Sequence, residues 1–104
     1  MAEKYSVYLS PAAERQELQH LRFLGQVSKK AAVELRNRFV EAFSSLEEMP
    51  KRYPFLDEEG FPKNKYRKLF VANWFLVLYE VIENRVVIDY ILDCRQDYRW
   101  LLRG

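Results

Sequence analysis

The side chains of this sequence that could perform chemistry are cationic and phenolic groups in its last third. Such groups suit RNA cleavage, because fixed cations stabilise a negatively charged pentavalent phosphorus while a Tyr or Lys transfers protons. Cations on a sheet edge could instead hold phosphate groups, or simply guard that edge against pairing with another chain. The candidates are Lys65, Arg67, Lys68, Arg95, Tyr98 and Arg99.

The sequence contains no recognisable motif for another kind of reactive centre. There is no glycine-rich phosphate loop and no Ser–His–Asp set. The single histidine, His20, has no acidic or Cys neighbour at the spacing of metal ligands, and the single Cys94 allows neither an internal disulfide nor a zinc cluster. We therefore expect no metal, no cofactor and no small-molecule substrate. Asp89, charged within an apolar run, either pairs with an Arg or lies on a solvent-facing flank.

Three dense runs of β-branched, Leu and aromatic residues must position the candidate groups. They cover residues 66–71, 74–82 and 85–92, with breaks of about two residues between them. Connections this short join antiparallel neighbours, because parallel strands need a crossover of a dozen residues or more. The middle run is apolar on both faces apart from Glu80, so it belongs inside the sheet with material packed on each side. Alternation places Trp74, Leu76, Leu78 and Ile82 on one face and Phe75, Val77, Tyr79 and Val81 on the other.

The N-terminal half begins with a short strand and a first helix. Residues 5–9 alternate as a strand does, and Ser10 then offers an N-cap before Pro11, which suits the first helical position. This helix is expected to stop at Gly25. The residues it should bury are Leu18, Leu21 and Leu24.

A second helix is expected from Ser28 to Pro50. Only about three residues separate the two helices, so they should form an antiparallel hairpin across one sheet face. Glu34 and Arg38 have the spacing of a helical ion pair. The apolar stripe, at alternating steps of three and four, consists of Ala32, Leu35, Phe39, Ala42, Leu46 and Met49.

Two segments lie outside these regular elements. Residues 50–65 have no periodicity, and we predict an ordered loop held by Tyr53, Phe55 and Phe61. At the other end, Asp93 with Gln96 resembles a capping box, which predicts a short C-terminal helix. That helix would carry Tyr98, Trp100, Leu101 and Leu102, which either fold back on the sheet or form a partner site.

Composition indicates one domain that spans residues 1–104. A hydrophobic fraction of 49% suits a single core in a chain of this length. The start lacks the apolar stretch of a signal peptide, and the longest apolar region is shorter than the roughly 20 residues of a membrane span. We therefore expect a cytoplasmic protein that does not enter membranes. Its net charge is only +2, yet four cations, Lys63, Lys65, Arg67 and Lys68, fall within six positions.

This order of elements resembles the RelE/ParE superfamily of bacterial toxin–antitoxin modules, and particular strings carry the resemblance. Residues 5–13 (Tyr-Ser-Val-Tyr-Leu-Ser-Pro-Ala-Ala) are similar to its opening strand and helix start, and residues 39–54 to the end of its second helix and the following loop. Residues 66–81 and 91–98 are similar to its sheet core and exit. The resemblance implies an α+β fold: an N-terminal strand, an α-helical hairpin, and a three-stranded antiparallel meander that completes a four-stranded sheet, with a short C-terminal helix.

Within the superfamily, the branch that cleaves mRNA on the ribosome uses basic sheet residues and a C-terminal proton-transfer residue. Arg67 stands where that branch has a strand Lys. Leu76 stands where it has an Arg, Leu69 replaces another Lys, and Leu101 and Leu102 stand where its terminal Tyr is expected. The long hairpin and the Met-Pro-x-Arg-Tyr-Pro loop are more similar to the ParE branch, whose members poison DNA gyrase by binding.

The resemblance therefore implies a ParE-like toxin of a type II toxin–antitoxin system, of the kind associated with plasmid stabilization and growth inhibition. It implies DNA gyrase as the target and a cognate antitoxin as the neutralising partner, with action by binding rather than as an enzyme. Two alternatives stay open: a ribosome-dependent mRNA endoribonuclease, and a non-toxic binding module of the same fold. We expect target contacts among the six candidates named first and antitoxin contacts at Trp100 and Leu101.

Overall fold

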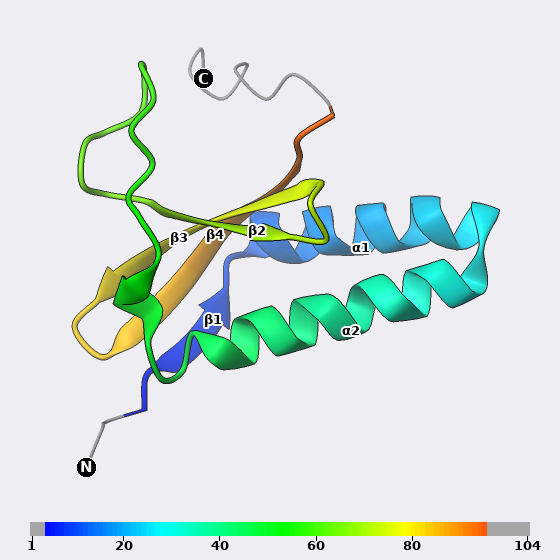
Figure 1. The fold of residues 1–104 in the computed structure, drawn as a ribbon, viewed down its shortest axis with the longest axis horizontal. Helices are drawn as coiled ribbons and strands as arrows, with labels where there is room; N and C mark the ends of the chain where they lie inside the picture. The colour runs from blue at the N-terminus through cyan, green and yellow to red at the C-terminus, as the bar shows by residue number, and fades with distance from the viewer. Residues whose placement is uncertain (1–3, 96–104) are drawn as a thin grey trace.

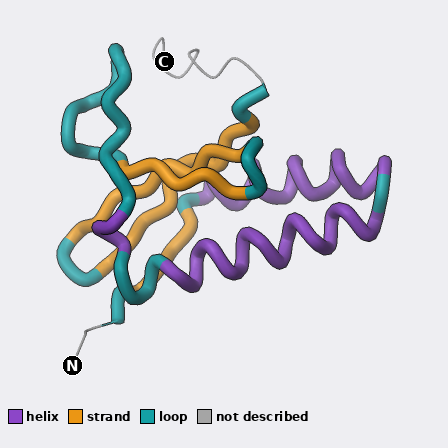
Figure 2. The backbone as a smooth tube through the Cα atoms, in the orientation of Figure 1, coloured by secondary structure: helices purple, strands orange, loops and turns teal. Residues whose placement is uncertain are grey.

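The computed structural model describes residues 4–95 and shows the predicted α+β architecture (Figures 1 and 2). A helical hairpin forms one layer and a four-stranded sheet forms the other. The expected C-terminal helix, with Asp93 as its N-cap, lies outside the described residues except for its first positions; there Asp93 ends the last strand, and Cys94 and Arg95 form a turn. The elements are β1 (Ser6–Leu9), α1 (Pro11–Val27), α2 (Lys29–Ser45), the 3-10 turn η1 (Pro50–Arg52), β2 (Arg67–Val71), β3 (Phe75–Ile82) and β4 (Arg85–Asp93).

The sheet has the strand order β1-β4-β3-β2. Strands β2, β3 and β4 form the predicted antiparallel meander. Strand β1 lies on the other side of β4 and runs parallel to it, from Ser6 beside Arg85 to Leu9 beside Ile88, so the sheet is mixed. The long excursion through the helical hairpin allows this parallel pairing, since such pairs need a long connection.

The central strand β3 is buried on both faces, as its alternation predicts. Phe75, Val77 and Tyr79 belong to the main core under the helical hairpin, whereas Leu76 and Leu78 belong to a second cluster on the opposite face. The prediction that Trp74 begins this strand was wrong. Residues 72–74 form the β2–β3 turn, in which two successive residues have positive φ. Trp74 is consequently half exposed rather than packed in the sheet.

The two helices are joined by one residue rather than three. Helix α1 runs through Gly25 to Val27, because Ser28 caps both helices: its N–H donates to the Leu24 carbonyl at 2.8 Å, and its Oγ accepts from Ala31 N at 3.1 Å. The expected stop at Gly25 was therefore wrong, as was the burial of Leu18, which is half exposed. In the described part of the chain, no helix has both the length and the apolar character that crossing a bilayer requires.

Helix α2 ends at Ser45, one turn before the expected end at Pro50. The chain leaves the helix at Leu46, whose fully buried side chain belongs to the main core, and the Glu47 carbonyl accepts a 2.7 Å hydrogen bond from Tyr5 N. This hydrogen bond ties the backbone after α2 to the start of the chain. Met49 is consequently exposed, although its spacing placed it in the buried stripe.

Strand β4 contains a β-bulge that the sequence did not reveal. Leu78 pairs with Tyr90 and Tyr79 pairs with Ile88, which leaves Asp89 as the extra residue. The bulge shifts the alternation of β4 by one position, and the Asp89 carbonyl accepts a 2.9 Å hydrogen bond from the Ser10 hydroxyl at the start of α1. As a result the main core receives Val86, Ile88 and Ile91, and the second cluster receives Tyr90 and Leu92.

Candidate functional site

An open apolar groove lies between the helical hairpin and one end of the sheet. Its volume is about 530 Å³, and its walls come from α1, α2, the β2–β3 turn and the end of β4. Three large apolar side chains on its walls are unusually exposed: Phe23 at 68%, Val27 at 78% and Trp74 at 52%. Exposed apolar groups gathered around a concave surface are typical of a site that binds another molecule.

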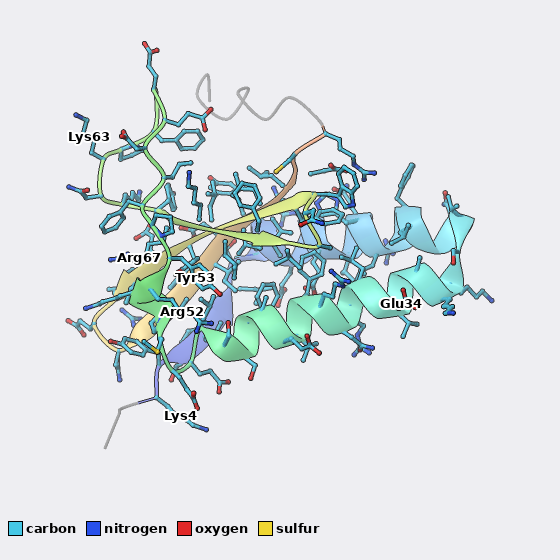
Figure 3. All side chains as sticks on the ribbon, in the orientation of Figure 1. Lys4, Glu34, Arg52, Tyr53, Lys63 and Arg67 are labelled. Carbon is cyan, nitrogen blue, oxygen red and sulfur yellow. The ribbon has the colours of Figure 1, made fainter. Side chains whose placement is uncertain are left out.

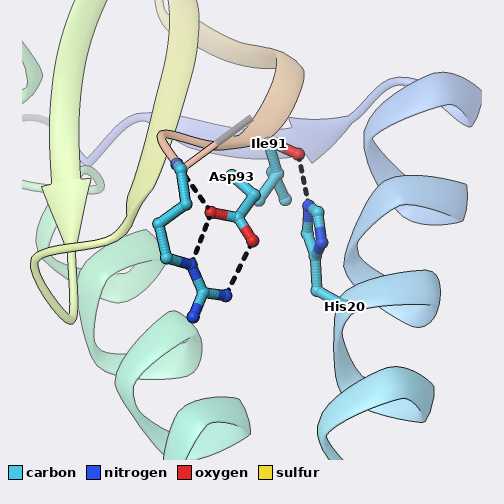
Figure 4. A network of polar contacts seen from close by, with 4 residues as sticks. His20, Ile91 and Asp93 are labelled. Atoms are coloured by element: carbon cyan, nitrogen blue, oxygen red, sulfur yellow. Dashed lines mark hydrogen bonds and ion pairs between the residues drawn. The ribbon is translucent and has the colours of Figure 1, made fainter. Parts of the chain in front are cut away.

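Asp93 and Arg95 bind each other at the sheet side of the groove (Figure 4). The Asp93 carboxylate accepts hydrogen bonds from the Arg95 guanidinium, at 2.9 Å from Nε and 2.7 Å from Nη2, and from Arg95 N at 2.9 Å. These bonds lower the pKa of Asp93. The Arg95 guanidinium also lies 5.3 Å from the Trp74 ring centroid. Arg95, a predicted target contact, is thus held in position by the Asp93 carboxylate.

His20 is a second polar group in the groove, and it has a packing role. Its Nε2 lies 2.8 Å from the Ile91 carbonyl, and because a carbonyl can only accept, this nitrogen carries the hydrogen. The ring centroid lies 4.9 Å from that of Phe75. Among residues 4–95, no group of three His, Cys, Asp or Glu is placed to hold a metal ion.

The α2 wall of the groove carries two charged side chains that have no partner within residues 4–95. Glu34 and Arg38 both line it, and Figure 3 labels Glu34 on α2. Their expected ion pair is not formed, and neither side chain has an ion pair or hydrogen bond within residues 4–95. These two charges are therefore available to a molecule that enters the groove.

Arg67 holds the loop before β2 in place (Figure 3). Its Nη1 donates to the carbonyls of Lys51, at 3.0 Å, and Tyr53, at 2.7 Å, and its guanidinium lies 4.0 Å from the Phe55 ring centroid. The neighbouring Tyr79 hydroxyl donates to the Pro50 carbonyl at 2.6 Å, and burial raises the pKa of Tyr79 to about 12. The loop is therefore ordered, as predicted.

The anchors of this loop differ partly from those expected. Tyr53 packs on the main core and Phe61 on the second cluster, as the sequence indicated, whereas Phe55 belongs to neither cluster and is exposed beside the Arg67 guanidinium. Leu56, which sequence reasoning missed, is the buried anchor in the second cluster. Its position beside aromatic residues was the only signal.

The predicted target contacts do not form one surface within residues 4–95. Lys65 is exposed, with Nζ 3.7 Å from the Glu80 carboxylate, and Lys68 lies on the opposite side of β2 from Arg67. Arg67 pairs with Tyr79 in the middle of β3, whereas Arg95 follows the strand that pairs with the start of β3, at Phe75. Tyr98, Arg99, Trp100 and Leu101 lie outside the described residues.

Of the two positions that the sequence allowed, Asp89 takes the one on the solvent-facing side, where it is partly exposed. Its side chain lies near Glu80 and Lys65 rather than near an Arg. Burial, followed by repulsion from Glu80, raises the pKa of Asp89 to about 6. The bulge accounts for this, because it turns the carboxyl toward the outer face of the sheet.

Sequence reasoning also missed the groove itself. Phe23 and Val27 stand four residues apart on α1, beside the stripe of Leu21 and Leu24, and this spacing was the one available signal. Nothing in the sequence placed the β2–β3 turn opposite them.

Comparison with known proteins agrees with this geometry. The family model described as ParE toxin of type II toxin-antitoxin system, parDE, matches residues 7–98. No curated protein sequence matches the chain. A solved structure of the chromosomal ParDE TA system from P. aeruginosa superimposes with a TM-score of 0.69 and 15% identity, over 86% of this chain and 96% of that chain. At this identity, the likeness shows a common fold.

Proposed function

This chain belongs to the ParE toxin family of type II toxin–antitoxin systems, and we propose that it inhibits growth by binding a cellular target until a cognate antitoxin neutralises it. The observation that carries the proposal is the open groove with Phe23, Val27 and Trp74 on its walls. A toxin that must be held inactive by a partner needs a surface of this kind.

The groove suits an amphipathic helix of the antitoxin. Such a helix would place apolar residues at steps of three and four against Phe23, Val27 and Trp74, as in other helix-in-groove complexes. Its flanks would carry an acidic group opposite Arg38 and a basic group opposite Glu34, because both charges lack partners in the described part of the chain. The expected antitoxin contacts at Trp100 and Leu101 stay part of this proposal.

Binding, rather than catalysis, is the proposed mode of action. Arg67 Nη1 already donates to two backbone carbonyls and the guanidinium lies against the Phe55 ring, and these contacts compete with the stabilisation of a phosphorane. Leu76 stands where the mRNA-cleaving branch of the superfamily has an Arg, and it is 2% exposed within the second cluster. Loss of one preorganised cation typically costs about 100- to 1000-fold in rate.

DNA gyrase is the proposed target, which would place the toxin in the cytoplasm. Family membership supports this, together with the exposed cations around the loop: Lys51, Arg52 and Lys65 are all solvent accessible. The predicted contacts Tyr98 and Arg99 stay candidates. Because the loop is fixed by Arg67 and Tyr79, its cations are presented without a large ordering cost on binding.

Inducible expression without antitoxin, with pulse labelling of DNA, RNA and protein synthesis, tests the proposal. We expect DNA synthesis to stop first, and the purified chain to inhibit supercoiling by gyrase. A translation block with codon-dependent mRNA cleavage would replace the proposal by the ribonuclease. Normal growth would indicate a non-toxic binding module.

A further inference from the structure

The side of α2 that points away from the core carries two exposed valines. Leu35 and Phe39, on one side of the helix, enter the main core. Val33 and Val40, on the opposite side, are each 57% exposed. They stand seven residues apart, so they lie in one line along the helix. Figure 1 shows α2 along one long side of the molecule, where a second molecule can approach it.

Three polar residues extend this line toward both ends of the helix. Together with the valines they form the outer line of α2: Lys30, Val33, Asn37, Val40 and Ser44. Their steps alternate between three and four, which is the spacing of the contact residues between paired helices. All five residues are exposed. An Asn in the middle of such a line is typical of helix pairs whose register it fixes.

The charged residues of α2 oppose the polarity of the helix itself. The N-terminal end of a helix is partially positive, yet α2 begins with Lys29 and Lys30 and has no acidic residue in its first turn. The C-terminal end is partially negative, yet acidic residues surround it, namely Glu41, Glu47 and Glu48. None of these five side chains has an ion pair within residues 4–95. A second helix that runs the opposite way would supply partners at both ends.

The acidic end of α2 is also concave. An open hollow of about 460 Å³ lies there, and its walls include Lys4 from the start of the chain and Val40 from the outer line. Glu41, Glu47 and Glu48 line it as well. Three carboxylates around one amine give the hollow a negative charge, so it suits cationic side chains.

We propose that two copies of this chain associate through the outer line of α2, with the two helices antiparallel about a two-fold axis. Val33 of each copy then contacts Val40 of the other, and the two Asn37 side chains meet near the axis. Lys30 comes about level with Ser44 of the other copy, so the basic end of each helix reaches the acidic hollow of the other. A parallel pair would instead bring like charges together at both ends. The inference goes beyond the proposed function and does not depend on it.

The size of the contact determines its strength. Five residues from each copy form a contact at the low end of protein interfaces, so we expect a reversible equilibrium between monomer and dimer. A cation beside the outer line, Arg36, would approach its counterpart across the axis. Burial raises the pKa of Glu17 on α1, and Arg36 acts to lower it. Since Arg36 interacts with this carboxylate of its own chain, its repulsion across the axis is reduced.

The dimer leaves the groove open. The residues of α2 that line the groove lie on another side of the helix from Val33 and Val40, since they include the buried Leu35. One dimer can therefore bind two antitoxin molecules at once. It would also present two copies of the target contacts, and linked contacts bind a target more tightly than single ones.

Sedimentation velocity of the purified full chain tests the association. We expect the mean sedimentation coefficient to rise from that of a monomer toward that of a dimer over roughly 5–500 µM, the range suited to a contact of this size. Val40→Asp places a charge in the contact and should weaken association at least about tenfold. Val27→Asp, the same change on the groove wall, is the matched control and should associate as the wild type does.

Cysteine cross-linking tests the direction and register of the two helices. The Cys94→Ser background removes the one thiol of the sequence. In that background, Asn37→Cys should form a disulfide-linked dimer with itself under mild oxidation. Chains with Lys30→Cys should cross-link to chains with Ser44→Cys but not to one another. Arg22→Cys, at an exposed position of α1, is the control and should stay monomeric.

Each contrary outcome overturns the inference in a recognisable way. A chain that sediments as a monomer throughout, or whose association is unchanged by Val40→Asp, does not use the outer line of α2. Loss of association in Val27→Asp would assign the contact to the groove instead. Self-cross-linking of Lys30→Cys would show a parallel pair. The proposed function stands or falls separately, through toxicity and antitoxin binding.

Discussion

Arg67 and Tyr79 stand directly opposite each other on β2 and β3, and both donate hydrogen bonds to the same turn. Arg67 binds the carbonyls of Lys51 and Tyr53, and Tyr79 binds the carbonyl of Pro50. Two neighbouring side chains of the sheet thus hold one end of the loop that carries the exposed cations. Arg67, which the sequence analysis names as a candidate target contact, therefore also stabilises the loop.

Arg67→Ala should destabilise the fold by about 1–3 kcal/mol, because two backbone carbonyls lose a charged donor. Arg95→Ala should cost less than about 1 kcal/mol, since Arg95 is exposed and its pairing with Asp93 is local. Thermal unfolding of both variants measures the difference. Equal effects would show that Arg67 does not hold the loop.

Tyr79→Phe should lower stability by about 1 kcal/mol through loss of one buried hydrogen bond. The variant should also change how the free energy of unfolding depends on alkaline pH. Burial raises the pKa of Tyr79 from 10.0 to about 12, so the unfolded chain releases this proton first, and stability falls as pH rises from 10 to 12. Denaturant unfolding at several alkaline pH values should show a weaker fall for Tyr79→Phe than for the wild type. An identical fall would contradict this assignment.

Asp89→Asn should stabilise the protein at pH 7.5. The pKa of Asp89 is raised from 3.8 to about 6, so the folded state binds a proton more readily, and wild-type stability should increase as pH falls from about 7 toward 4. The gain for Asn at pH 7.5 should be of the order of 1 kcal/mol, after screening of a partly exposed carboxyl is considered. Melting temperatures across this pH range test the slope, with Glu34→Gln, on the groove wall, as control. A wild-type slope retained in Asp89→Asn would disprove the role of this carboxyl.

Val27→Asp should weaken antitoxin binding by at least about 30-fold, because it places a charge on the apolar wall of the groove. Its folding stability should change little, since Val27 is 78% exposed. Val33→Asp makes the same change at an exposed position of α2 that does not line the groove, and should bind normally. Titration calorimetry compares the two, and equal affinities would remove the groove from the antitoxin site.

The double variant Lys65→Ala, Lys68→Ala should lose gyrase inhibition while its melting temperature stays within about 2 °C of wild type. Lys65 makes only a 3.7 Å surface contact with Glu80, and exposed pairs of this kind contribute at most about 1 kcal/mol. A supercoiling assay measures the loss. Full inhibition by the double variant would leave as remaining candidates Arg67, Arg95, Tyr98, Arg99 and the loop cations Lys51 and Arg52.

The sequence alone determined the features that depend on neighbouring residues. The alternation along β3 established its two buried faces, and Ser10 with Pro11 established the start of α1, where Ser10 Oγ accepts from Ala13 N at 3.0 Å. The short connections determined the antiparallel meander, since no other pairing is reachable through so few residues. These signals are local, so they can be read without the fold.

Only the tertiary structure decided the features that depend on distant residues. The bulge at Asp89 depends on a bond from Ser10, which is 79 positions away, and the role of Arg67 depends on carbonyls 14 and 16 positions earlier. The groove exists because α1, α2 and the β2–β3 turn, which are far apart in the sequence, come together around Phe23, Val27 and Trp74. Backbone carbonyls are present at every residue and carry no sequence signal, so a contact with one of them becomes visible only when the chain has folded.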